Sequence, residues 1–278
     1  MSAGAAGTTR RDFLVAAALI YAGWWIVNSA LFALAGPELL QGDTKLGFTL
    51  NLAVFAVLIG LTARITGAFH RRPWMELWGD TARLRSDFVG VLIACGLVYA
   101  VLIAMGFQPS RAEMRPLAGW LVFLPVALLG ILIQTGAEEL FFRGYLQQYC
   151  ARALRSPYAW MVVPSFFFGV SHALNDTSST GASLAYIAWA TCFGLAAADL
   201  TARTGSLGAA WGLHVAVNVS ALMIANQDGA PMSAAALFIF PERSEDYVPG
   251  ATIIVVQTLF EVAFLALLWL AARNAIRR

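Results

Sequence analysis

The sequence predicts an all-α membrane protein, a polytopic bundle of about eight transmembrane helices. Of its 278 residues, 59% are hydrophobic and only 12% are charged, about half the charged share of an ordinary soluble domain. The apolar residues form continuous runs of roughly 20, which favour spanning helices over the alternating strands of a membrane β-barrel. The net charge of +2 gives no indication of nucleic-acid binding.

Eight apolar runs have about the length needed to cross a bilayer. They cover residues 12–35, 46–69, 88–106, 117–137, 158–175, 183–202, 207–226 and 250–272. We expect the fourth to continue as a helix to about residue 154, because only Gly144 interrupts "ELFFRGYLQQYCARAL". The chain then divides into three parts. Residues 1–116 hold the first three spans, residues 117–226 form a core, and residues 227–278 hold an outer loop and the last span.

The basic residues orient these spans, because cytoplasmic loops carry an excess of Lys and Arg. With the N-terminus inside, 14 of the 18 basic residues fall in inner segments, and the other four are Lys45, Arg111, Arg115 and Arg243. We therefore expect both termini in the cytoplasm. The high Ala and Gly content suggests a bacterial source, so the bilayer would be the bacterial inner membrane. Arg10 and Arg11 resemble a twin-arginine export signal, but the long apolar run behind them favours a retained first helix.

The first polar stretch inside the apolar runs is "AEELFFRGYL", residues 137–146. A charge in a bilayer centre costs several kcal/mol, so such residues are functional candidates. Glu139 and Arg143 are four residues apart with the acid first, which suits an ion pair on a helix. Glu138 is turned about 100° away and has no cation on its own helix, so it is a candidate general base. The alternative is a helix end whose charges face cytoplasmic water.

Two later stretches place a histidine and a second side chain on one helix face. In "FFFGVSHALND", residues 166–176, Phe168 and His172 are four residues apart. In "GSLGAAWGLHVAVNVS", residues 205–220, His214 and Asn218 have the same spacing, and the small residues before them allow close helix approach. Each stretch alone is also compatible with a structural hydrogen bond between helices. Together, a base, two histidines and an asparagine in a membrane cavity would suffice for hydrolysis.

The order and spacing of the three stretches resemble those of a known family. "EELFFR" fits EExxxR, "FGVSH" fits FxxxH and "HVAVN" fits HxxxN. This ordered set is similar to that of the CPBP family of intramembrane proteases, also called the ABI family, to which the type II CAAX prenyl endopeptidases belong. The resemblance covers roughly residues 118–226. No motif position departs from the pattern, which implies an active enzyme.

The resemblance also implies roles for the matching residues. Glu138 would be the catalytic base, with His172 helping to activate the water. His214 and Asn218 would form the oxyanion site. The supporting residues would be Glu139, Arg143 and Phe168. The implied substrate is a membrane-anchored protein or peptide within the lipid bilayer.

Three alternatives stay open at this level. A zinc ion could be held by Glu138, His172 and His214, the His₂Glu set of some zinc enzymes. We favour no metal or other cofactor, because the chain has no HExxH and an Asn beside the second His suits an oxyanion donor. A non-catalytic immunity or scaffold protein of the same fold is the second alternative. A transporter is the third, although the two halves show no repeat symmetry.

The eight-span topology contains one conflict. It puts Glu138 at the inner surface and His172 near the outer end of the fifth span, where the two could not meet. A longer, tilted fourth helix would place Glu138 deeper in the membrane, and we favour this solution because the helical pattern continues beyond Glu139. Asp199 and Arg203 are also four residues apart and are expected to form a structural ion pair.

Overall fold

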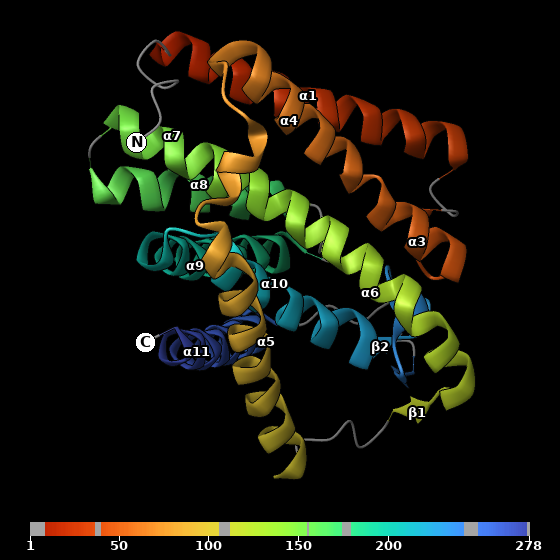
Figure 1. Cartoon of the computed structure of the whole chain (residues 1–278). Coiled ribbons are helices and arrows are strands. Elements are labelled where there is room, and N and C mark those ends of the chain that lie inside the picture. Colours follow the sequence, from red (N-terminus) through yellow and green to blue (C-terminus); the bar gives the residue numbers. More distant parts are fainter. Residues whose placement is uncertain are drawn as a thin grey trace. The chain divides into compact units, whose positions relative to one another are not determined.

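The structure confirms the predicted membrane helix bundle. It is a computed structural model that describes residues 9–36, 40–105, 112–154, 156–173, 179–241 and 250–276, apart from the side chain of residue 154. The α-helices are α1 (Arg10–Ala35), α3 (Lys45–Ala53), α4 (Phe55–His70), α5 (Thr81–Ala104), α6 (Leu117–Glu139), α7 (Gln148–Leu154), α8 (Pro157–Ser171), α9 (Thr180–Thr204), α10 (Gly208–Val219) and α11 (Ala251–Ala275) (Figure 1).

In the part of the chain that the structure describes, the eight predicted runs fall mainly on helices, and six helical segments there are long and apolar enough to cross a membrane. The second run is divided by Val54 into α3 and α4. The fifth and seventh runs form shorter helices: α8 has 15 residues, and the seventh covers Gly208–Ile224. About eight membrane helices is therefore consistent with the structure.

The fourth helix continues past the motif glutamates, as expected. Helical structure extends without a break from Leu117 to Ala153. The sequence did not indicate that its middle part, η3 (Leu140–Gln147), is a π-helix, nor that α10 continues into a second π-helix, η4 (Ser220–Ile224). Such wide turns inside α-helices frequently mark functional sites. η3 contains residues 140–143 of the first motif, and η4 begins two residues after Asn218 of the third motif.

A small β-sheet was also not predicted. Its strands are β1 (Glu113–Met114), β2 (Ala225–Gln227) and β3 (Phe238–Phe240), in the order β1-β3-β2. β3 is antiparallel to β1 and parallel to β2. Strands of two or three residues are too short to leave a recognisable alternation of polar and apolar residues, which explains why sequence analysis missed them.

The described chain forms two compact units. Unit 1 comprises residues 1–77, 102–141 and 214–243, and unit 2 comprises residues 78–101, 142–213 and 244–278. In unit 1, α1 packs along α4, and both α3 and α4 pack along α6. Trp120 at the start of α6 donates a hydrogen bond to the Ala235 carbonyl (2.9 Å), and Arg115 donates to the Ser233 carbonyl (2.8 Å). These bonds fix the 3₁₀ turn η5 (Ser233–Ala235) against the start of α6.

In unit 2, α9 packs against both α8 and α11. The expected Asp199–Arg203 ion pair is confirmed at 2.8 Å. Asp199 also accepts a hydrogen bond from the Trp269 indole of α11 at 3.0 Å. The predicted close approach at the small residues of α10 is confirmed as well: a side chain at Gly208 or Gly212 would collide with backbone carbonyls of α5.

Candidate active site

The two glutamates of the first motif meet the third motif in unit 1, on α6 and on the second half of α10. Glu138 and Glu139 are the last residues of α6, and His214 lies in α10. All three are buried, with relative exposures of 6%, 0% and 3%. Their burial excludes the alternative in which both acids face cytoplasmic water.

The imidazole of His214 lies between the two carboxylates. Its Nδ1 is 2.7 Å from Oε1 of Glu139, and its Nε2 is 3.4 Å from Oε2 of Glu138. An ionised carboxylate only accepts hydrogen bonds, so Nδ1 donates to an ionised Glu139 and Nε2 is left facing Glu138. The second contact is not a hydrogen bond, and among the described residues Oε2 of Glu138 has no hydrogen-bond partner. Sequence analysis found no partner for Glu138 on its own helix, because His214 comes from a different helix.

A second polar contact lies one helical turn away on the same two helices. The side-chain amide of Asn218 donates a hydrogen bond to Oε1 of Gln134 at 2.7 Å. Gln134 precedes Glu138 by four residues, and Asn218 follows His214 by four, so α6 and α10 run antiparallel here. Gln134 is a buried residue that sequence analysis missed. A polar side chain one turn before Glu138 in an otherwise apolar run was the signal that could have identified it.

The second motif and Arg143 meet in unit 2. The guanidinium of Arg143 lies over the ring of Phe168, 4.5 Å from its centroid, and 5.6 Å from that of Phe193. Phe168 also contacts His172, with ring centroids 4.3 Å apart. The aromatic residue of FxxxH therefore contacts both the Arg of the first motif and the His of the second.

The backbone also fixes His172. Its Nδ1 lies 2.7 Å from the carbonyl oxygen of Phe168. A carbonyl oxygen only accepts hydrogen bonds, so Nδ1 carries the proton and a neutral His172 has its lone pair on Nε2. A further aromatic residue that sequence analysis missed is Tyr186, which stacks on His172 at 6.2 Å.

The predicted site is thus divided between the units. Unit 1 brings together Glu138, Glu139, His214 and Asn218, while unit 2 brings together Arg143, Phe168 and His172. Within the described ranges, no group of three or more His, Cys, Asp and Glu side chains could hold a metal ion. The zinc alternative with Glu138, His172 and His214 draws its ligands from both units, and both it and metal independence stay predictions.

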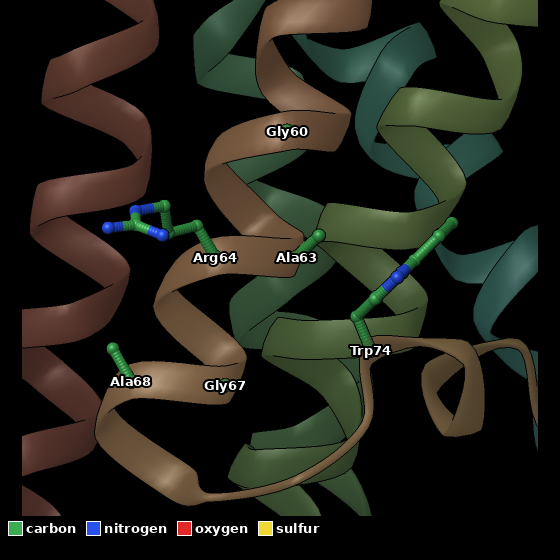
Figure 2. A pocket seen from close by; sticks show the side chains of 6 residues that line it. All are labelled: Gly60, Ala63, Arg64, Gly67, Ala68 and Trp74. Atoms are coloured by element: carbon green, nitrogen blue, oxygen red, sulfur yellow. The ribbon is translucent and has the colours of Figure 1, made fainter.

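A surface groove of about 580 Å³ lies elsewhere in unit 1, along α4. Figure 2 shows Arg64 and Trp74 extending to opposite sides of the helix, with Gly60 and Gly67 on the helix between them. The other lining residues are Ala63 and Ala68. None of the predicted site residues lines this groove, so the groove is separate from the candidate active site.

Comparison with known proteins identifies the segment that carries these residues. Residues 117–220 match the family described as "Type II CAAX prenyl endopeptidase Rce1-like". This segment is similar to the Rce1-like family. All three motifs lie inside the matched residues, and the family is a protease family. Together with the six long apolar helices, this makes the chain an integral membrane protein.

One curated relative of this chain comes from Bacillus subtilis (strain 168) and is named "Uncharacterized protein YyaK". It is 40% identical over 100 residues, which make up 36% of this chain and 32% of the relative. The match thus spans about a third of the relative's length. No solved structure matches the chain.

Proposed function

We propose that this protein is an intramembrane endopeptidase that hydrolyses peptide bonds of membrane-associated proteins or peptides. The observation that carries the proposal is the pair of polar contacts between α6 and α10. One contact, Glu138–His214–Glu139, offers a base. The other, Gln134–Asn218, offers an amide donor. Both lie in the segment that matches the Rce1-like family, so their geometry and the family point to the same chemistry.

In the proposed reaction, Glu138 accepts a proton from a water molecule, and the water oxygen attacks the carbonyl carbon of the scissile peptide. The carbonyl oxygen becomes negatively charged as the tetrahedral intermediate forms. The C–N bond then breaks, and the proton held by Glu138 passes to the leaving amine. Glu138 is ionised again at the end of the cycle, so atoms and charge balance.

The spacing of the two contacts suits this reaction. A helical turn separates them by about 5.4 Å along the helix axis. A base and an oxyanion donor that act on the same carbonyl group stand roughly 5 to 7 Å apart, because a hydrogen bond of about 2.8 Å lies on each side of the reacting atoms. Glu138 can therefore reach the attacking water while Asn218 reaches the oxyanion.

His214 joins the two functions. In the proposed reaction, Nε2 of His214, which lies 3.4 Å from Oε2 of Glu138, donates a hydrogen bond to the developing oxyanion once a peptide enters. The 2.7 Å contact of Nδ1 with Glu139 orients the ring. Glu139 thus acts through His214 as a positioning residue.

His172 and Arg143 have supporting roles in the proposal. His172, whose Nδ1 is bonded to the Phe168 carbonyl, keeps the role that the family resemblance implies, which is to help activate the attacking water. Arg143, on the ring of Phe168, supports the orientation of the second motif. We propose a reaction without a metal ion, because one carboxylate and protein donors supply the base and the oxyanion site.

The match to a prenyl endopeptidase family and the long apolar helices support a membrane-associated peptide as substrate. We propose that cleavage occurs near a lipid anchor, a terminal transmembrane tail or a leader peptide. The location would be the bacterial inner membrane with both termini in the cytoplasm, as the distribution of basic residues indicates.

Comparative membrane proteomics of wild-type cells and cells carrying Glu138→Ala tests the proposal. We expect one or more uncut precursors to accumulate in the variant, and these would identify the substrate. The variant must still be inserted and must keep the melting temperature of the wild-type protein in detergent. Normal processing by such a folded variant would mean that the protein is a scaffold or immunity protein and not a peptidase.

A further inference from the structure

The glutamine on α6 has no place in the three motifs. Gln134 is 92% shielded from solvent, with a relative exposure of 8%, and it lies in the apolar run "GILIQTGAEEL" (residues 130–140). An amide in such surroundings is unfavourable unless it forms hydrogen bonds. Its Oε1 accepts the 2.7 Å hydrogen bond from the half-buried Asn218, so the contact offsets the burial of the Gln134 amide.

This bond fixes the rotation of the Asn218 side chain. An asparagine amide has two faces of opposite character, a carbonyl oxygen that accepts and an NH₂ group that donates two hydrogen bonds. Because Gln134 presents its oxygen, the NH₂ group of Asn218 is turned toward α6, the helix that carries Glu138. One N–H is bonded to Gln134, and the second points into the neighbouring space at a fixed angle. Without an acceptor at position 134, the Asn218 amide can rotate so that its oxygen takes the place of its NH₂ group. That oxygen would then repel an oxyanion.

We infer that Gln134 is a positioning residue that holds Asn218 in its donor orientation, an inference that rests on the proposed peptidase function. Gln134 and Glu138 share one face of α6, just as His214 and Asn218 share one face of α10. One rigid helix therefore carries the base and sets the direction of the oxyanion donor. The register between α6 and α10 aligns both at once.

A double-mutant cycle separates this role from a purely structural one. The variants are Gln134→Met, Asn218→Ala and the double change, each replacing the natural protein in its own cells. The measured quantity is the rate of conversion, by pulse–chase, of the precursor that accumulates with Glu138→Ala. Gln147→Met is the matched control, because Gln147 is a buried glutamine that donates to the Ala198 carbonyl at 3.0 Å. Each rate is divided by the amount of folded protein.

We expect Gln134→Met to slow conversion by about 10- to 100-fold, the range expected for a misplaced or lost oxyanion donor. In the Asn218→Ala background the same change should cost less than about three-fold, because no amide remains to be oriented. Gln147→Met should lower the melting temperature as much as Gln134→Met while conversion stays near the wild-type rate. Two outcomes overturn the inference: a Gln134→Met rate within about three-fold of wild type, or equal costs in the two backgrounds.

If Gln134→Met does not accumulate as folded protein, Gln134→Ser replaces it in the cycle. Serine keeps a polar group, but its hydroxyl is too short to reach Asn218, so the same loss and the same dependence on Asn218 are expected. The failure of the proposed function looks different. In that case Glu138→Ala causes no precursor to accumulate, and the inference falls with the function. Accumulation with Glu138→Ala and normal conversion with both Gln134 variants would overturn the inference alone.

Discussion

The two adjacent glutamates provide the sharpest test of the proposed chemistry, because they have the same side chain and different partners. Glu138→Gln and Glu139→Gln are nearly isosteric changes that each remove one negative charge. Glu138 Oε2 has no hydrogen-bond partner among the described residues and faces His214 Nε2 at 3.4 Å. Glu139 Oε1 is bonded to His214 Nδ1 at 2.7 Å. The first change should remove the base, and the second should only weaken the support of a histidine.

The geometry gives different magnitudes for the two changes. A general base contributes typically 10²- to 10⁴-fold, which corresponds to roughly 3 to 5 kcal/mol at about 1.4 kcal/mol per factor of ten. In Glu139→Gln the amide oxygen still accepts from Nδ1, so a charged hydrogen bond of about 1.5–3 kcal/mol becomes a neutral one of about 0.5–1.5 kcal/mol. The loss is roughly 1 to 1.5 kcal/mol, or about 5- to 12-fold in rate.

The assay is pulse–chase conversion of the precursor that accumulates with Glu138→Ala, with variant abundance and melting temperature measured in parallel. We expect Glu138→Gln to fall at least ten-fold below Glu139→Gln. The reverse order would refute the assignment of the base: if Glu139→Gln stops conversion while a folded Glu138→Gln retains more than a tenth of the wild-type rate, then Glu139 is the base.

Three further predictions address the other contacts. Phe168→Leu removes the ring beneath the buried guanidinium of Arg143 and should destabilise the protein by at least 1–2 kcal/mol, which is measured as a lower melting temperature. The control Phe166→Leu changes an exposed ring of the same helix and should have little effect on the melting temperature. Gly212→Ala would force a methyl group against a carbonyl of α5 and should lower the free energy of unfolding by about 1–3 kcal/mol. The control Gly96→Ala has open space around it and should be neutral or slightly stabilising. Equal melting temperatures for the two variants would contradict the close packing of α10 against α5. Chelator treatment should leave precursor conversion unchanged, and elemental analysis finding a stoichiometric zinc that is required for conversion would overturn the metal-independent reaction.

Local spacing was enough to predict the long helices and several contacts within them, but not the π-helices or the small sheet. The continuous apolar runs gave the long helices, and the absence of breakers after Glu139 gave the extended fourth helix. The i,i+4 spacing of Asp199 and Arg203 gave an ion pair that the structure confirms. The same spacing put Phe168 beside His172, where the two rings are in contact. All of these features depend on residues that lie within one or two helical turns of each other.

Contacts between helices could not be read from spacing. Sequence analysis left Glu138 without a partner because its own helix supplies none, whereas His214 comes from a segment more than 70 residues later. The hydrogen bond from Asn218 to Gln134 depends on the register of α6 against α10, which neither helix encodes alone. The ion pair expected between Glu139 and Arg143 stays a prediction.

The register of α6 against α10 explains why the first motif needs two adjacent acids. Consecutive residues of a helix point about 100° apart, so two neighbouring carboxylates can approach one imidazole from different sides. One carboxylate contacts Nδ1 at 2.7 Å and thereby orients the ring, and the other faces Nε2 at 3.4 Å. A single carboxylate could orient the imidazole through Nδ1 or face Nε2 as the proposed base, but it could not do both. Sliding α10 by one turn would bring Asn218 to the acids, separate His214 from them, and remove the base and the oxyanion donor from reach of the same peptide bond.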